Sequence, residues 1–170
     1  KYIQMDMYNL KELVTRLIAG SSIEINPDKF QNDMTTFASA DDVLTLLVHL
    51  GYLTYDFDTC TVHIPNQEVQ KEFINCIEDG GWEPVMDAIR KSEELLAATI
   101  RGEEETVARM IENAHQENTS ILAYNDENSL ACVIALAYYS AKKNYVVYRE
   151  LAGGKGFADM VFVPRKTTQT

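Results

Sequence analysis

The chain has 170 residues, of which 46% are hydrophobic and 24% charged, a composition typical of a folded globular protein with one core or two small ones. Its apolar runs are too short to span a membrane, and its N-terminus lacks the pattern of a secretory signal, so we expect a cytoplasmic protein with no membrane partner. The formal net charge of −11 argues against general binding to nucleic acid.

The charge is distributed unevenly along the chain. Residues 1–120 carry 9 basic and 22 acidic side chains, a net charge of −13, whereas residues 121–170 carry 6 and 4, a net charge of +2. Such a difference indicates at least two modules, and only the second is expected to meet phosphate groups.

Apolar residues at helical spacing predict an amphipathic helix over Tyr2–Ala19, which Gly20 ends. Ser21–Phe37 contains Asn-Pro-Asp and predicts a connection with a short extended or helical element. A second, leucine-rich helix is expected over residues 41–50, with Ser39 or Asp41 as its N-cap.

Two runs of strand-forming residues, 52–55 and 61–64, follow that helix and predict a β-hairpin. A further helix is expected over residues 66–78. Helix, glycine and hairpin in this order are typical of a winged helix, so residues 1–80 are predicted to form a winged-helix-like helical module. Because the helix at 41–50 carries two aspartates and no Lys or Arg, we interpret the module as a protein-packing unit and not as a DNA reader.

Residues 81–119 are predicted to form a helical hairpin that links two modules, with helices over 82–98 and 103–118 and a stop at Gly102. Three consecutive glutamates open the second helix, where the positive end of the helix dipole favours them. We interpret them as a solvated first turn and not as a metal cluster. The cysteines have no metal-ligand or disulfide spacing and are predicted to be reduced packing residues: Cys60, Cys76 and Cys132.

The last module, residues 120–170, is predicted as helix, strand, turn, strand. A helix is expected over residues 126–144, and two β-rich runs around a glycine-dense turn predict a hairpin over Tyr145–Pro164. Glu150 lies on the first strand and Asp159 on the second, and Glu127 lies in the first turn of the helix. Carboxylates on adjacent strands beside a basic turn are suited to a divalent cation such as Mg²⁺.

The run ENSLACVIALAYYSAKKNYVVYRELAGGKGFADMVFVP resembles the beginning of the PD-(D/E)xK nuclease-like domain of bacterial proteins that also carry an AAA-ATPase-like domain. The resemblance implies a metal-dependent phosphodiesterase with Mg²⁺ as cofactor and nucleic acid bound through residues 121–170. Asp159, in GFADMVFVP, matches the Asp of the second core strand and is implied as a catalytic and metal-binding residue. Glu127 and Glu150 both fit the earlier acidic position, and the sequence does not distinguish them.

The chain departs from this family at its end. A third core strand with an acidic residue and a Lys would follow Pro164, and residues 165–170 contain neither an acidic-x-Lys pattern nor a strand. We therefore expect an α+β, mostly helical protein that ends in an incomplete nuclease-like core, with no bound metal and no nuclease activity of its own. No phosphate-binding loop of the GxxxxGK[ST] kind occurs, so nucleotide hydrolysis is not expected.

Two functional hypotheses of different classes remain. The first is a fragment of a nucleic-acid-processing enzyme. The second is an acidic helical interaction or regulatory module without catalysis, supported by the strongly acidic residues 1–120. In either case a two-stranded hairpin leaves an unpaired edge, so the strand Phe157–Val163 is expected to self-associate or to pack against another part of the chain.

Overall fold

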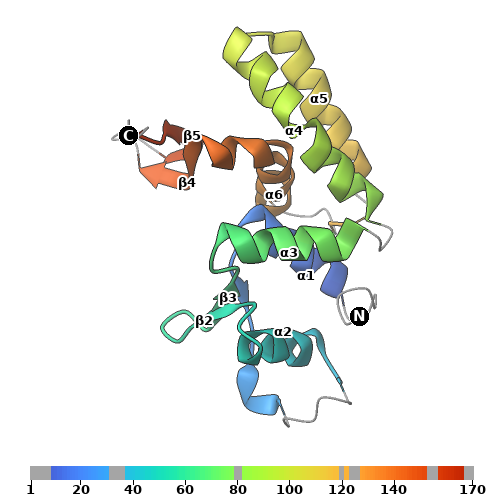
Figure 1. Cartoon of the computed structure of the whole chain (residues 1–170), viewed down its shortest axis with the longest axis vertical. Coiled ribbons are helices and arrows are strands. Elements are labelled where there is room, and N and C mark those ends of the chain that lie inside the picture. The colour runs from blue at the N-terminus through green and yellow to red at the C-terminus, as the bar shows by residue number, and fades with distance from the viewer. Residues whose placement is uncertain are drawn as a thin grey trace.

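The computed structural model describes residues 9–30, 37–78, 82–118, 121–122, 127–152 and 157–166, apart from the side chains at positions 29, 127, 128, 150 and 157. Within these ranges the protein is α+β and mostly helical (Figure 1). The helices are α1 (Leu10–Ala19), α2 (Ala40–His49), α3 (Gln67–Glu78), α4 (Glu83–Arg101), α5 (Glu104–Asn118) and α6 (Glu127–Ala137), with the 3-10 helices η1 (Pro27–Lys29) and η2 (Tyr139–Lys143). The strands are β1 (Ile23–Glu24), β2 (Thr54–Asp56), β3 (Thr61–His63), β4 (Tyr145–Ala152) and β5 (Phe157–Pro164).

The first part of the chain combines three helices with a small antiparallel sheet. Its strand order is β1-β3-β2, so β3 pairs on both sides. Val62, at the centre of β3, faces Ile23 on one side and Tyr55 on the other, and its side chain is fully buried. The hairpin that the sequence predicts after α2 is confirmed, and β1 adds a third strand from the connection that follows α1.

Helices α1 and α4 end in the same way, at glycines in the left-handed conformation. Gly20 has φ 99° and Gly102 has φ 71°, values that other residues adopt at a cost in free energy. In each case the glycine N–H and the next N–H donate to carbonyls of the last helical turn. Both glycine stops predicted from the sequence are confirmed.

Helix α2 begins with a capping box. The Ser39 hydroxyl accepts from the Asp42 N–H at 3.3 Å, and Asp42 Oδ2 accepts from the N–H groups of Ala38 at 2.8 Å and Ser39 at 3.0 Å. These bonds satisfy donors that the first turn of a helix otherwise leaves unpaired. The predicted N-cap at Ser39 is confirmed, and the helix starts at Ala40.

Replacing Ser39 with alanine is expected to lower the free energy of unfolding by about 1 kcal/mol, because the Asp42 N–H loses its acceptor. Urea unfolding followed by circular dichroism measures this change. Ser39→Thr keeps the hydroxyl acceptor and should stay close to the wild type. Equal losses in both variants would contradict a role for the hydroxyl.

One continuous core joins the early and late helices. Helix α6 packs against α1 on one side and against α4 and α5 on the other, so the last predicted module shares its core with the first (Figure 1). Leu17 of α1, Leu95 of α4 and Leu136 of α6 are all at least 98% buried in this cluster. Within the described ranges, no helix is both long and apolar enough to cross a membrane.

Two expectations from the sequence are wrong in detail. The α-helix predicted over residues 126–144 ends at Ala137 and continues as the 3-10 helix η2. The Ser140 N–H donates to Ser92 Oγ of α4 at 3.2 Å, a bond between helices that replaces the regular helical pattern. Of the three cysteines, only Cys132 is buried; Cys60 and Cys76 are exposed, and all three are free thiols.

Candidate functional site

The candidate site lies on the C-terminal hairpin. Strands β4 and β5 pair antiparallel from Tyr145–Pro164 to Ala152–Phe157, which confirms the predicted hairpin over Tyr145–Pro164. Val, Tyr and Phe dominate both strands, and such side chains favour the extended backbone. The turn at residues 153–156, with the glycines and Lys155, lies outside the described residues.

The two faces of this hairpin differ. Side chains directly opposite each other in an antiparallel pair lie on the same face. On the inner face Tyr145, Phe162 and Met160 pack against the core. Tyr138, between α6 and η2, contacts the Phe162 ring at 5.1 Å between centroids. The outer face is solvent-exposed and partly apolar, with Tyr148 45% and Val163 42% exposed.

Asp159 belongs to the outer face. The pairs Arg149–Met160 and Leu151–Ala158 bracket it, so the register places position 159 opposite position 150. Its side chain is exposed to solvent. The backbone therefore brings two acidic positions of the sequence next to each other, on neighbouring strands.

The other two predicted site residues are only partly described. Glu150 is in β4 and Glu127 is the first residue of α6, but their side chains lie outside the described part of the structure. Among the side chains that are described, no three His, Cys, Asp or Glu residues gather closely enough to hold a metal ion. Asp159 alone offers the carboxylate oxygens that Mg²⁺ prefers, and Mg²⁺ often binds through only one or two carboxylates.

The glutamates at the start of α5 behave as surface groups. Glu103 pairs with Arg101, and this hydrogen bond lowers the pKa of Glu103 and raises the pKa of Arg101. Glu104 and Glu105 are exposed in the first helical turn. The described contacts agree with a solvated first turn, as the sequence analysis expects.

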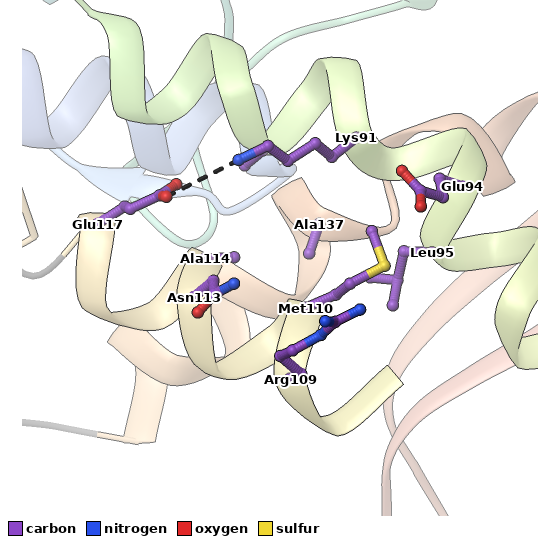
Figure 2. A pocket seen from close by; sticks show the side chains of 10 residues that line it. Lys91, Glu94, Leu95, Arg109, Met110, Asn113, Ala114, Glu117 and Ala137 are labelled. Carbon is purple, nitrogen blue, oxygen red and sulfur yellow. Dashed lines mark ion pairs between the residues drawn. The ribbon is translucent and has the colours of Figure 1, made fainter. Parts of the chain in front are cut away.

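A small cavity of about 170 Å³ lies between α4 and α5 (Figure 2). Met110 and Leu95 line it with apolar groups, and Lys91 reaches across to Glu117 with 3.8 Å between Nζ and Oε1. Both charged side chains at this rim are about half exposed, so their pairing contributes little free energy. Glu94, Arg109 and Asn113 add further polar groups to the lining, so the cavity is a partly polar gap between two helices.

Two basic side chains near the hairpin were not singled out by the sequence as site residues. Arg149 of β4 and Lys142 of η2 line a cavity of about 230 Å³ beneath the inner face of the hairpin. In the sequence, residues 121–170 have a positive balance of charge. That balance was the available signal, because the cavity is assembled from segments that are far apart in the chain.

Comparison with known proteins adds no neighbour: no family model, no curated protein and no solved structure matches this chain.

Proposed function

We propose that residues 127–164 are the first part of a PD-(D/E)xK nuclease-like core in a nucleic-acid-processing protein. The observation that supports this best is the register of β4 and β5, which follow α6 and η2 and have the acidic positions 150 and 159 opposite each other. Helix, strand, strand is the order in which that core begins. The proposal rests on the sequence resemblance together with this backbone arrangement.

In the intact core Asp159, with Glu150 or Glu127, would bind Mg²⁺. The metal ion would activate a water molecule and neutralise charge on the phosphodiester in the transition state. A third strand would supply a further acidic residue and a lysine. Strands β4 and β5 alone supply only part of this ligand set. We propose that this chain binds a divalent cation too weakly to hold it and does not cleave nucleic acid.

Metal binding tests the assignment of Asp159. Mn²⁺ titration followed by electron paramagnetic resonance should show a weak site in the wild type that is lost in Asp159→Asn. Glu104→Gln removes an exposed carboxylate in the first turn of α5 and should leave this site intact. Equal binding by the wild type and Asp159→Asn would contradict the assignment.

Cleavage assays test the second half of the proposal. Supercoiled and single-stranded DNA should stay intact when incubated with this chain and Mg²⁺ or Mn²⁺. Metal-dependent cutting that Asp159→Ala abolishes would show that the chain holds a complete site. If the encoded protein continues beyond Thr170, we expect an acidic-x-Lys strand within about 15 residues, a usual connection length.

A second candidate function is an acidic helical interaction or regulatory module. Residues 1–120 carry a net charge of −13. Helix α2 and the hairpin after it follow the order of a winged helix, but α2 has two aspartates in its first turn and no Lys or Arg. In this alternative the first 80 residues and the helical hairpin at 81–119 would contact a partner protein. Binding of basic proteins that disappears with added salt would favour it.

The hairpin edge supports a proposal about assembly. In the described part of the sheet β4 and β5 each pair on one side only, and the outer face exposes Tyr148 and Val163. We propose that this edge pairs with a second copy or with another part of the protein. Light scattering of a concentrated solution should show a species larger than the monomer; a strictly monomeric particle would contradict self-association.

We also propose a cytoplasmic location. The free thiols Cys60, Cys76 and Cys132 are consistent with it.

A further inference from the structure

The cavity beneath the inner face of the hairpin carries two cations. Its wall includes Gly20 at the end of α1, Lys142 in η2, and Arg149 with Met160 on the hairpin. A second cavity of about 310 Å³, lined by polar side chains of α3 and by His63, shares Gly20 and Lys142 with the first. The two cavities therefore lie on either side of Gly20 and Lys142, one toward β3 and α3 and the other toward the C-terminal hairpin.

Neither cation has a carboxylate partner among the described residues. Arg149 Nη1 donates to Ser21 Oγ at 3.0 Å, and Lys142 Nζ donates to the Ile18 carbonyl at 3.4 Å. The ion pairs formed by described side chains involve neither residue. By contrast, the neighbouring Lys143 is exposed and pairs with Glu93. In a protein with a net charge of −11, this is a local excess of positive charge.

The surrounding groups reinforce that excess. The buried thiol of Cys132 in α6 is influenced by three cations, Arg16, Arg149 and Lys142, and by one carboxylate, Glu12. Glu12 is already paired with Arg16 at 2.8 Å. The Arg16–Glu12 pair is neutral as a whole, so Arg149 and Lys142 leave about two positive charges without a counterion among the described side chains.

Burial makes this arrangement costly without a ligand. Burial lowers the pKa of Lys142 to about 8, because the charged ammonium loses water. The negative end of α1 offers it only a partial charge, and the Ile18 carbonyl there also accepts from Gln70 Nε2. An anion in the cavity would interact with both cations and offset the cost of burying the Lys142 ammonium.

The donors that remain fit a tetrahedral oxyanion. A guanidinium has five N–H donors and an ammonium has three, so Arg149 and Lys142 keep several after their bonds to the protein. Ser21 Oγ accepts from Arg149, which leaves its hydroxyl proton free to donate. A phosphate monoester carries a charge of about −1.5 to −2 at pH 7 and so matches both cations, whereas a carboxylate matches only one.

We propose that this cavity binds a phosphate monoester, whose phosphate oxygens lie between the Arg149 guanidinium and the Lys142 ammonium. The polar cavity on the other side of Lys142 would then hold the alcohol part of the ester, such as a sugar. This site is independent of the nuclease-like proposal. Arg149 and Met160 are on the inner face of the hairpin, and the alternation of side chains along β5 places Asp159 on the outer face.

Isothermal titration calorimetry on the full chain at pH 7 and constant ionic strength tests the proposal with ribose 5-phosphate, inorganic phosphate, acetate and ribose. We expect ribose 5-phosphate to bind with a Kd of about 1 mM or tighter, and acetate about tenfold more weakly. Tighter binding of ribose 5-phosphate than of inorganic phosphate assigns the ester as ligand; equal binding assigns the free anion to the same site. Undetectable binding of both phosphates, or acetate binding as tightly as they do, would overturn the proposal.

Variants tie the binding to the two cations. Lys142→Gln and Arg149→Gln should each weaken phosphate binding about tenfold or more, since each removes charge-assisted hydrogen bonds. Lys143→Gln removes the adjacent exposed lysine and should bind as the wild type does, and Asp159→Asn should do so as well. Loss of binding in Lys143→Gln equal to that in Lys142→Gln would place the anion elsewhere.

A second measurement does not depend on how the variants fold. Phosphate added to the wild type should shift the backbone amide resonances of Gly20, Ser21 and Val147, which lie at or beside the cavity. Resonance shifts confined to other parts of the chain would overturn the assignment.

A further variant separates charge from donor geometry. Arg149→Lys keeps the charge and loses the fork of donors, so it should bind phosphate more weakly than the wild type and more tightly than Arg149→Gln.

Discussion

Replacing Leu136 with alanine is expected to lower the free energy of unfolding of the whole chain by about 2 to 5 kcal/mol. Leu136 is fully buried on α6, which packs against α1, α4 and α5. The substitution removes buried methyl groups and leaves a cavity where these helices meet. Because the core is continuous, the loss should appear in a single unfolding transition followed by circular dichroism and by Trp82 fluorescence.

Leu130→Ala is the matched control for this prediction. Leu130 lies on the same helix and is 41% exposed, so its truncation removes less buried surface and should cost less than half as much. If Leu136→Ala instead produces two separate transitions, with only the second one shifted, the helices would belong to modules that unfold independently. That result would support the three segments expected from the sequence, residues 1–80, 81–119 and 120–170.

The contribution of Lys142 to the free energy of unfolding should rise by about 2 kcal/mol between pH 7 and pH 9.5. The lysine has an ordinary pKa of 10.5 in the unfolded chain, and burial lowers it to about 8 in the folded protein. Between these values the unfolded state binds more protons than the folded state, so the free energy of unfolding increases with pH. Below pH 8 the folded protein holds a buried charge, and above it that charge is gone.

The measurement is urea unfolding at several pH values for the wild type and Lys142→Met. The difference between the two profiles gives the contribution of Lys142 to the free energy of unfolding, because both proteins keep the other groups that face it. These groups are Cys132, Tyr139, His63, Arg149, Arg16 and Glu12. Burial raises the pKa of Cys132 to about 12, which opposes the rise above pH 9 in both proteins; Lys142→Met also removes one of the cations that lower this pKa. Lys143→Met should keep the rise, since the exposed Lys143 has its pKa raised by Glu93. A flat difference profile would contradict the buried charge.

Local signals explain why much of the fold could be predicted. Gly20 and Gly102 stop helices through their own backbone freedom, and Ser39 caps α2 with its own hydroxyl, so each acts within a few residues. The hairpin at β4 and β5 follows from its composition and its glycine-dense turn. The end of α6 could not be predicted in this way, because the Ser140 N–H bonds to Ser92 and the Tyr138 hydroxyl to Thr99, both on a distant helix.

The same difference between local signals and contacts of distant segments applies to the candidate sites. Asp159 was expected on a strand, and the register confirms its strand position, because the hairpin itself determines both. The metal site stays a prediction, since it needs side chains from several elements. The basic cavity was not foreseen, because Gly20, Lys142 and Arg149 meet only through packing between the first and the last parts of the chain. A lone lysine or arginine in a sequence does not reveal whether a carboxylate will face it.

The contact between α1 and α6 has a consequence for synthesis on the ribosome. Helix α1 ends at Ala19 and its partner α6 begins at Glu127, so the apolar face of the first helix is complete long before the surface that covers it. At about 5 to 20 residues per second, the nascent chain would expose part of that face for roughly 5 to 20 s. The core between α1 and α6 is therefore expected to reach its final packing only after α6 has left the ribosome.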